Sequence, residues 1–77
     1  MDPTAAFAAV LRRAREQQGF TQRELAGLAR VHPNFIGRME RGQQEPTLST
    51  IFALAVALDI EPDELMRDVK LAMRQPE

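Results

Sequence analysis

The stretch 33–41 of this 77-residue chain holds the side chains best suited to contact another molecule. A step of about 100° per residue divides a helix there into two sides. The polar or small side comprises Asn34, Gly37, Arg38 and Arg41, and the other side comprises Ile36, Met39 and Glu40. Asn can donate and accept together at an adenine edge, and Arg can make two parallel bonds to a guanine edge. The pattern favours a base-contacting helix, although every surface helix has a polar side.

Three residues in and beside this helix have separate roles to consider. Gly37 is small enough to let the helix backbone come close to a groove wall. Phe35 lies on the flank, where it could touch a thymine methyl or cover the junction with a neighbouring helix, and the second role is favoured. His32, the only histidine, stands at the helix start, where a turn role is favoured over catalysis.

Catalysis and metal binding lack the residues that they need. Ser49 is the only serine, the chain has no cysteine, and a single histidine cannot build a multi-histidine metal site. Asp63 and Glu64 are typical of charges in a first helical turn. We therefore expect no enzymatic activity, no metal and no cofactor.

The charge is divided unevenly along the chain. Residues 1–44 hold seven Arg against four acidic residues, a net +3, and residues 45–77 hold three basic against seven acidic residues, a net −4. A positive front and a negative back would orient the molecule toward a polyanion, with simple solubilisation as the equal alternative. The longest uncharged apolar run, 48–58, is far shorter than the ~20 residues of a membrane span. We expect a cytoplasmic protein without a membrane partner.

Five helices and no strand are predicted, so the expected fold class is all-α. Thr21 and Glu24 form a capping box, in which each side chain accepts from the other residue's backbone N–H. Asp2 and Thr47 are expected helix caps, and Gly19 suits the left-handed residue that ends a helix. The helices are expected at 4–18, from 21 onward, at 33–41, at 48–58 and at 62–74, in one domain of residues 1–77 that is ordered from about 4 to 74. The two short helices within 21–41 must cross at a steep angle as a helix-turn-helix.

The helix 48–58 is apolar nearly all round. Ile51, Leu54, Ala55 and Leu58 form one face, and Leu48, Phe52 and Val56 extend the apolar surface around it. Such a helix is either central in the core or covered by a partner. We expect part of the C-terminal region 48–74 to form a homodimer contact. The candidates, each with core packing as the alternative, are Phe52, Leu58, Ile60, Leu65, Met66 and Val69.

A resemblance to a known family begins at Thr21. The run TQRELAGLARVHPNFIGRMERGQQEPTLSTI resembles the helix-turn-helix signature of the lambda-repressor-like Cro family, also called the XRE family. The resemblance covers about 7–69 and is strongest in T-Q, E-L-A, Ile36, E-R-G and P-T-L, all at the family's spacing. Short one-domain members, including controller proteins of restriction–modification systems, are similar in length and in the pattern from His32 to Ile36.

The resemblance implies a role for several residues. Gln22 takes the position that grips a phosphate, and the helix that follows the turn is the recognition helix in the major groove. Pro33, Asn34, Gly37 and Arg38 match base-facing positions, and Arg41, Gln43 and Gln44 match backbone-contacting ones. The predicted DNA-binding set is Gln22, Arg23, His32, Pro33, Asn34, Phe35, Gly37, Arg38, Arg41, Gln43 and Gln44.

Two further residues take a structural role in the resemblance, and a third departs from the family pattern. Arg15 and Glu40 match an ion pair that fixes the recognition helix to the first helix. Arg30 stands where the family usually has Gly, so it is expected to adopt a positive φ at a cost of about 1 kcal/mol.

Taken together, these features predict a sequence-specific transcriptional regulator of double-stranded DNA. It is expected to bind an inverted-repeat operator as a homodimer, as a controller of a restriction–modification system for example. The alternative is an antitoxin, or another protein-interaction module of the same fold, whose main partner is a protein.

Overall fold

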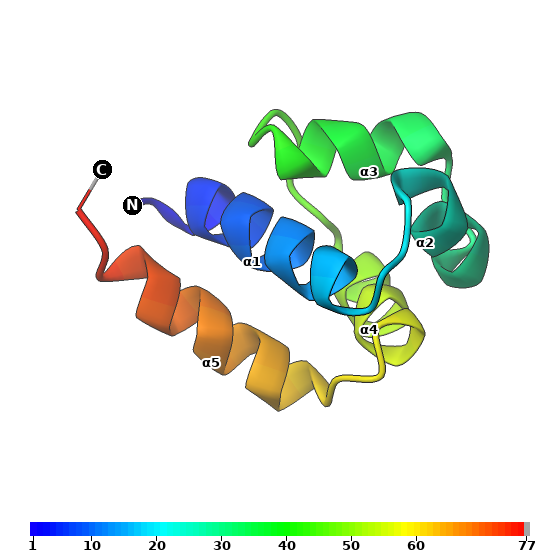
Figure 1. Ribbon diagram of the computed structural model, residues 1–77. Coiled ribbons are helices and arrows are strands. Elements are labelled where there is room, and N and C mark those ends of the chain that lie inside the picture. Colours follow the sequence, from blue (N-terminus) through cyan, green and yellow to red (C-terminus); the bar gives the residue numbers. More distant parts are fainter. Residues whose placement is uncertain (77) are drawn as a thin grey trace.

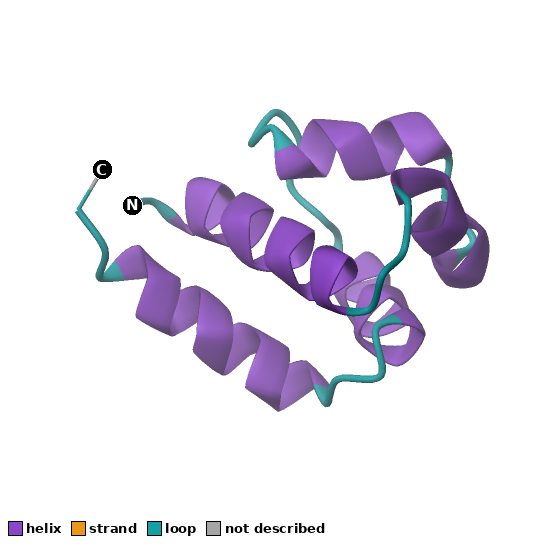
Figure 2. Cartoon of the chain, viewed as in Figure 1, coloured by secondary structure: helices purple, strands orange, loops and turns teal. Residues whose placement is uncertain are grey.

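The computed structural model describes residues 1–76, which contain five α-helices and no strand. The helices are α1 (Pro3–Gln17), α2 (Gln22–Ala29), α3 (Pro33–Glu40), α4 (Leu48–Ala57) and α5 (Pro62–Met73). Figure 1 shows their arrangement, and Figure 2 shows that the connections between them are short. The all-α fold class is confirmed, and the predicted helix bounds agree with the observed ones to within a residue.

Local capping explains why the helices begin where they do. Oγ1 of Thr21 accepts from the backbone N–H of Glu24 at 3.0 Å, and a Glu24 carboxylate oxygen accepts from the backbone N–H of Thr21 at 2.9 Å. This reciprocal pair is the predicted capping box. Asp2 and Thr47 each accept from the backbone N–H three residues on, at 2.8 and 3.1 Å. These bonds satisfy donors that the first turn of a helix leaves unpaired.

Left-handed residues end each of the first four helices or lie in the turns that follow them, with Gly42 in this position after α3. Gly19 has φ of 74° after α1, and Arg30 has φ of 59° and ψ of 44° at the end of α2. The prediction of a positive φ at Arg30 is confirmed. Asp59, with φ of 57° after α4, is a second non-glycine residue in this conformation, and its sequence position gave no warning of it.

Helix α1 lies at the centre of the packing. It packs against α5 on one side and α3 on the other, and α2 packs against α3 and α4. One core joins all five helices, with Leu11, Leu25, Ile36, Leu54 and Leu65 among its fully buried members. The core therefore fixes α2 and α3 as a helix-turn-helix on one end of the molecule.

The C-terminal helices correct part of the expected dimer surface. Leu58 and Leu65 are fully buried, and Val69 is 8% exposed, because α4 packs against α2 and α5 and α5 packs against α1. These three residues are core residues, and they leave little or no side-chain surface for a partner. Of the other candidates, Phe52 and Met66 are exposed and Ile60 is partly buried.

Candidate nucleic-acid interface

Helix α3 is divided into a buried side and an exposed side, as its sequence pattern predicts. Ile36 and Met39 are fully buried, and the Glu40 side chain is only 4% exposed. Asn34 and Arg38 point the other way and are exposed. A turn of residues 30–32 joins α2 to α3, and Gln22 in the first turn of α2 lies within hydrogen-bond distance of Glu40 at the end of α3.

An ion pair fixes α3 to α1 from its buried side. Nε of Arg15 donates to one Glu40 carboxylate oxygen at 2.6 Å, and Nη2 of Arg15 donates to the other at 2.9 Å. Nη1 of the same guanidinium donates to the carbonyl of Phe20 at 2.8 Å. Hydrogen bonding to Glu40 raises the pKa of Arg15. The geometry is that of the expected structural pair.

Gln22 also contacts this ion pair, and the sequence did not predict that contact. Its Nε2 donates to Oε1 of Glu40 at 3.1 Å, so Glu40 accepts bonds from both α1 and α2. Gln22 is the first residue of α2 and is exposed. The carboxylate therefore orients the amide of the residue that the resemblance places on a phosphate.

The backbone of α3 is covered at Gly37, which corrects the expectation that it could come close to a groove wall. Gly37 is buried, because the side chains of Arg41 and Gln22 lie over it. A Cβ at Gly37 would lie 3.0 Å from Nη1 of Arg41 and 3.5 Å from Oε1 of Gln22. The backbone at this position is covered rather than open to a groove wall.

The start of α3 is held by its own residues. Nδ1 of His32 accepts from the backbone N–H of Asn34 at 3.0 Å, so His32 is the N-cap, in agreement with the turn role. Pro33 opens the helix, where its missing N–H leaves no bond unmade. Phe35 is partly buried and packs against the core, as the favoured alternative predicted.

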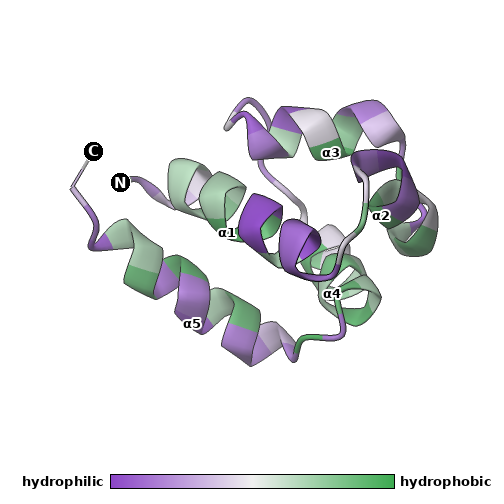
Figure 3. Cartoon of the chain, viewed as in Figure 1, coloured by the Kyte–Doolittle hydropathy of each residue, from purple (hydrophilic) through white to green (hydrophobic). Residues whose placement is uncertain are grey.

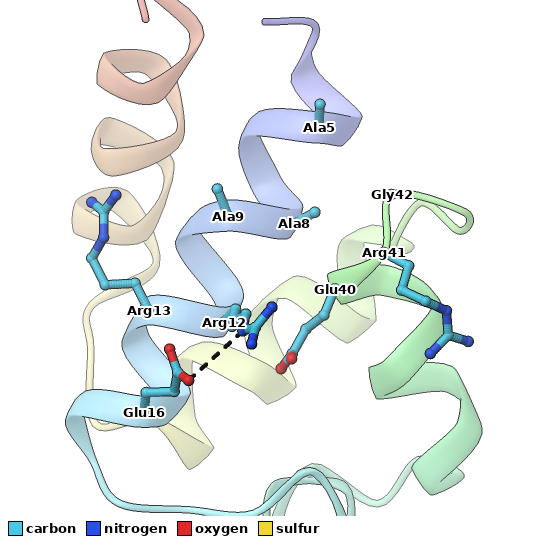
Figure 4. Close-up of a pocket in the computed structure, with 9 residues that line it drawn as sticks. All are labelled: Ala5, Ala8, Ala9, Arg12, Arg13, Glu16, Glu40, Arg41 and Gly42. Atoms are coloured by element: carbon cyan, nitrogen blue, oxygen red, sulfur yellow. Dashed lines mark ion pairs between the residues drawn. The ribbon is translucent and has the colours of Figure 1, made fainter. Parts of the chain in front are cut away.

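The turn after α3 carries the remaining predicted contact residues. Nε of Arg41 donates to Oε1 of Gln43 at 3.2 Å, and Nε2 of Gln44 donates to the Glu45 carbonyl at 3.4 Å. The Thr4 hydroxyl donates to the Glu45 carboxylate at 2.7 Å and ties the turn to α1. Figure 4 shows Glu40 pointing from α3 toward α1, with Arg41 on the opposite side of α3.

The cations on this face have no intramolecular carboxylate partner among residues 1–76. The ion pairs of that part of the chain are Arg12 with Glu16 at 3.7 Å and Arg15 with Glu40 at 2.6 Å. Arg23, Arg38 and Arg41 take part in neither and are exposed. Three uncompensated positive charges therefore stand beside the polar side of α3.

A second exposed surface, on α4, is apolar. Leu48, Phe52 and Val56 follow one another at every fourth residue and are 72, 52 and 79% exposed. Figure 3 shows α4 hydrophobic over nearly its whole length. We call these three residues the α4 stripe. The sequence pattern identified the apolar excess on this helix, but the candidate list included only Phe52 from the stripe.

Two other kinds of site find no support in the described structure. No helix within residues 1–76 is both long enough and apolar enough to cross a bilayer. In the same part of the chain, no three or more His, Asp or Glu side chains gather where they could hold a metal ion.

Comparison with known proteins places this geometry in a family. The helix-turn-helix family model HTH_3 matches residues 11–65. The restriction–modification controller protein C.AhdI from Aeromonas hydrophila is 42% identical, with a TM-score of 0.78 over 80% of this chain and 94% of its own. The clp gene regulator ClgR from Corynebacterium glutamicum is 28% identical, with a TM-score of 0.89 over 99% of both chains.

Curated sequences give the same result. Control protein C.SmaI of Serratia marcescens is 33% identical over 66 residues, which are 86% of this chain and 79% of C.SmaI. The chain spans 33 to 70% of the length of other curated regulators that it matches. The chain belongs to the XRE family of helix-turn-helix proteins, whose members similar to it are transcriptional regulators and restriction–modification controllers.

Proposed function

We propose that this chain is a sequence-specific transcriptional regulator that inserts α3 into the major groove of double-stranded DNA. The observation that carries the proposal is the division of α3. Its inward side is buried, while Arg38 and Arg41 stand exposed and without a carboxylate partner among residues 1–76. A surface cation without a partner is free to bind a phosphate or a base edge.

The first turn of α2 supplies contacts to the DNA backbone. The Gln22 amide is oriented by Glu40, and Arg23 beside it is exposed. Backbone N–H groups at a helix start attract anions, and an adjacent cation strengthens that attraction. These contacts fix the position of α3 in the groove and are insensitive to base sequence.

We further propose that two copies associate through the α4 stripe. When exposed apolar side chains gather on one helix face, that face is often an interaction surface. A second copy is favoured because one helix-turn-helix offers few base contacts, and a two-fold dimer doubles them on an inverted repeat. The named role of C.AhdI favours a controller of restriction–modification genes as the cellular role.

Selection from a random duplex library, with purified protein at near-physiological salt, tests the DNA-binding proposal. We expect enrichment of an inverted repeat with half-sites about one helical turn apart. A folded protein that enriches no sequence would contradict the proposal and favour the antitoxin alternative.

Sedimentation tests self-association separately. At tens of micromolar protein we expect a dimer. A monomer at that concentration would contradict self-association and indicate that the α4 stripe binds a different protein. Affinity capture, with the Val56→Glu variant as control, would then identify that protein. The genomic position of the enriched operator tests the controller role, which predicts an operator beside restriction and modification genes.

A further inference from the structure

Helix α3 has fewer base-contacting side chains than its length allows. Among the four positions that the family resemblance places against the bases, Pro33 has no donor and Gly37 has no side chain. The space over Gly37 is nevertheless occupied, because the guanidinium of Arg41 lies there. The side chain of Arg41 thus runs back along the helix by one turn, the direction that helical side chains prefer.

One hydrogen bond and the absence of a side chain at Gly37 position the Arg41 guanidinium. Its Nε donates to Oε1 of Gln43 at 3.2 Å, from the turn beyond the helix. Its Nη1 lies 3.0 Å from the position that a Cβ of Gly37 would take, a spacing that real side chains rarely have. Gly37 therefore permits this placement, and Gln43 orients it. Neither Nη1 nor Nη2 has a hydrogen bond to residues 1–76.

We propose that Arg41 is a base-contacting residue that recognises a guanine, with Gly37 as its cradle and Gln43 as its anchor. This assignment rests on the proposed function and differs from the backbone contact that the family resemblance implies for Arg41. The two free terminal nitrogens are the donors that pair with O6 and N7 of guanine. Nη1 lies over the middle of α3, in the place of the side chain that Gly37 lacks.

Because the guanidinium is already oriented in the free protein, little side-chain freedom is lost on binding. Preorganisation of this kind favours a directional contact over a diffuse one. Arg38 would then recognise one base pair and Arg41 a second. The half-site would carry two guanine preferences rather than one.

Two substitutions of Arg41 separate a base contact from a phosphate contact. In library selection, we expect Arg41→Ala to reduce the preference for guanine at one position of each half-site by about 10- to 100-fold. Arg41→Lys keeps the positive charge but lacks the planar fork. It should retain affinity for non-operator DNA and its salt dependence while losing the same preference. Arg13→Ala, on the side of α1 away from α3 in Figure 4, is the control with matched loss of charge.

A third variant tests the cradle. Gly37→Val fills the space under the guanidinium with methyl groups, and Val has a better helix propensity than Gly, so the fold should persist. We expect Gly37→Val to lose the guanine preference that Arg41→Ala loses. In the Arg41→Ala background the same change should leave the base profile as it was. Thermal melting of each variant confirms that it is folded.

The possible results are distinguishable. Equal weakening of all sequences by Arg41→Ala, with the ranking of bases unchanged and a shallower salt dependence, would overturn the assignment and indicate a phosphate contact. Retention of guanine preference by Gly37→Val, or a new change of base profile in the double variant, would overturn the cradle. A wild-type chain that enriches no sequence would overturn the proposed function as well.

Discussion

Helices α3 and α4 bury one side in the same core, yet their exposed sides have opposite chemistry. The exposed side of α3 carries Asn34 and two cations, whereas the exposed side of α4 carries the α4 stripe. Both helices begin with a side-chain cap, at His32 and Thr47. Their starts and their burial are thus determined in the same way, and only the outward residues differ.

The two exposed sides can differ because they contribute little to the free energy of unfolding. A side chain that is exposed in the monomer gains little from folding, so its chemistry reports on a partner rather than on the core. Unpaired cations suit a polyanion, and a continuous apolar stripe suits another protein surface. The predictions below test this comparison by changing one side at a time.

The largest effect is expected on the buried side of α3. Glu40→Ala leaves the Arg15 guanidinium nearly buried without its carboxylate, which should lower the free energy of unfolding by about 3 kcal/mol. Chemical denaturation measures this change directly. A variant that unfolds at the same denaturant concentration as the wild type would show that the pair is dispensable. Glu40→Gln, which keeps one acceptor, should cost less.

The exposed side of α4 should affect assembly and leave folding intact. Val56→Glu places a charge in the α4 stripe, and we expect self-association to weaken by about 2 kcal/mol or more. The monomer should keep its stability to within about 0.5 kcal/mol, because the position is 79% exposed. Sedimentation at several concentrations measures the self-association, and thermal melting measures the stability of the monomer. Gln17→Glu, an exposed change on α1, is the charge control, and equal dissociation in both variants would argue against the stripe.

The exposed side of α3 should affect sequence preference. Arg38→Ala is expected to lose about 1–3 kcal/mol on the operator and to relax the preference at one base pair. Gln22→Ala should instead weaken binding to all sequences alike, since its contact is to the backbone. Its loss should leave α3 in place, because Arg15 still holds Glu40 at 2.6 and 2.9 Å. If both variants weakened binding to all sequences equally, the assignment of Arg38 to a base and of Gln22 to the DNA backbone would be wrong.

The smallest effect is expected in the turn between α2 and α3. Arg30→Gly relieves a left-handed conformation that costs a non-glycine residue about 1 kcal/mol. The melting temperature should stay the same or rise by a few degrees, since Gly also adds freedom to the unfolded chain. A clear fall would indicate that the Arg30 side chain makes a contact of its own.

Local signals made the fold predictable from the sequence. The starts of α1 to α4 are each capped by a side chain within one turn, as Thr21 and Glu24 cap α2, whereas α5 begins at Pro62 without a side-chain cap bond. The pair of Arg15 with Glu40 could be inferred because the resemblance supplied its register. The positive φ of Arg30 followed from the same source, whereas Asp59 had no such guide.

The surfaces were harder to predict, because they depend on packing between distant segments. Periodicity showed that α4 is apolar nearly all round, but the choice of its covered side depends on where α2 and α5 pack. For that reason Leu58 and Leu65 were expected at an interface and lie in the core. The cover over Gly37 depends on the rotamers of Arg41 and Gln22, which no spacing rule supplies.

The way in which α3 is held has a consequence for how such a protein changes over evolutionary time. Ile36, Met39 and Glu40 attach the helix to the body of the molecule from its inward side. Positions on the outward side can therefore be exchanged with little cost to folding, so new operators are accessible through single substitutions. The same scaffold can follow a drifting target sequence, or acquire an unrelated one, while its inward residues stay unchanged.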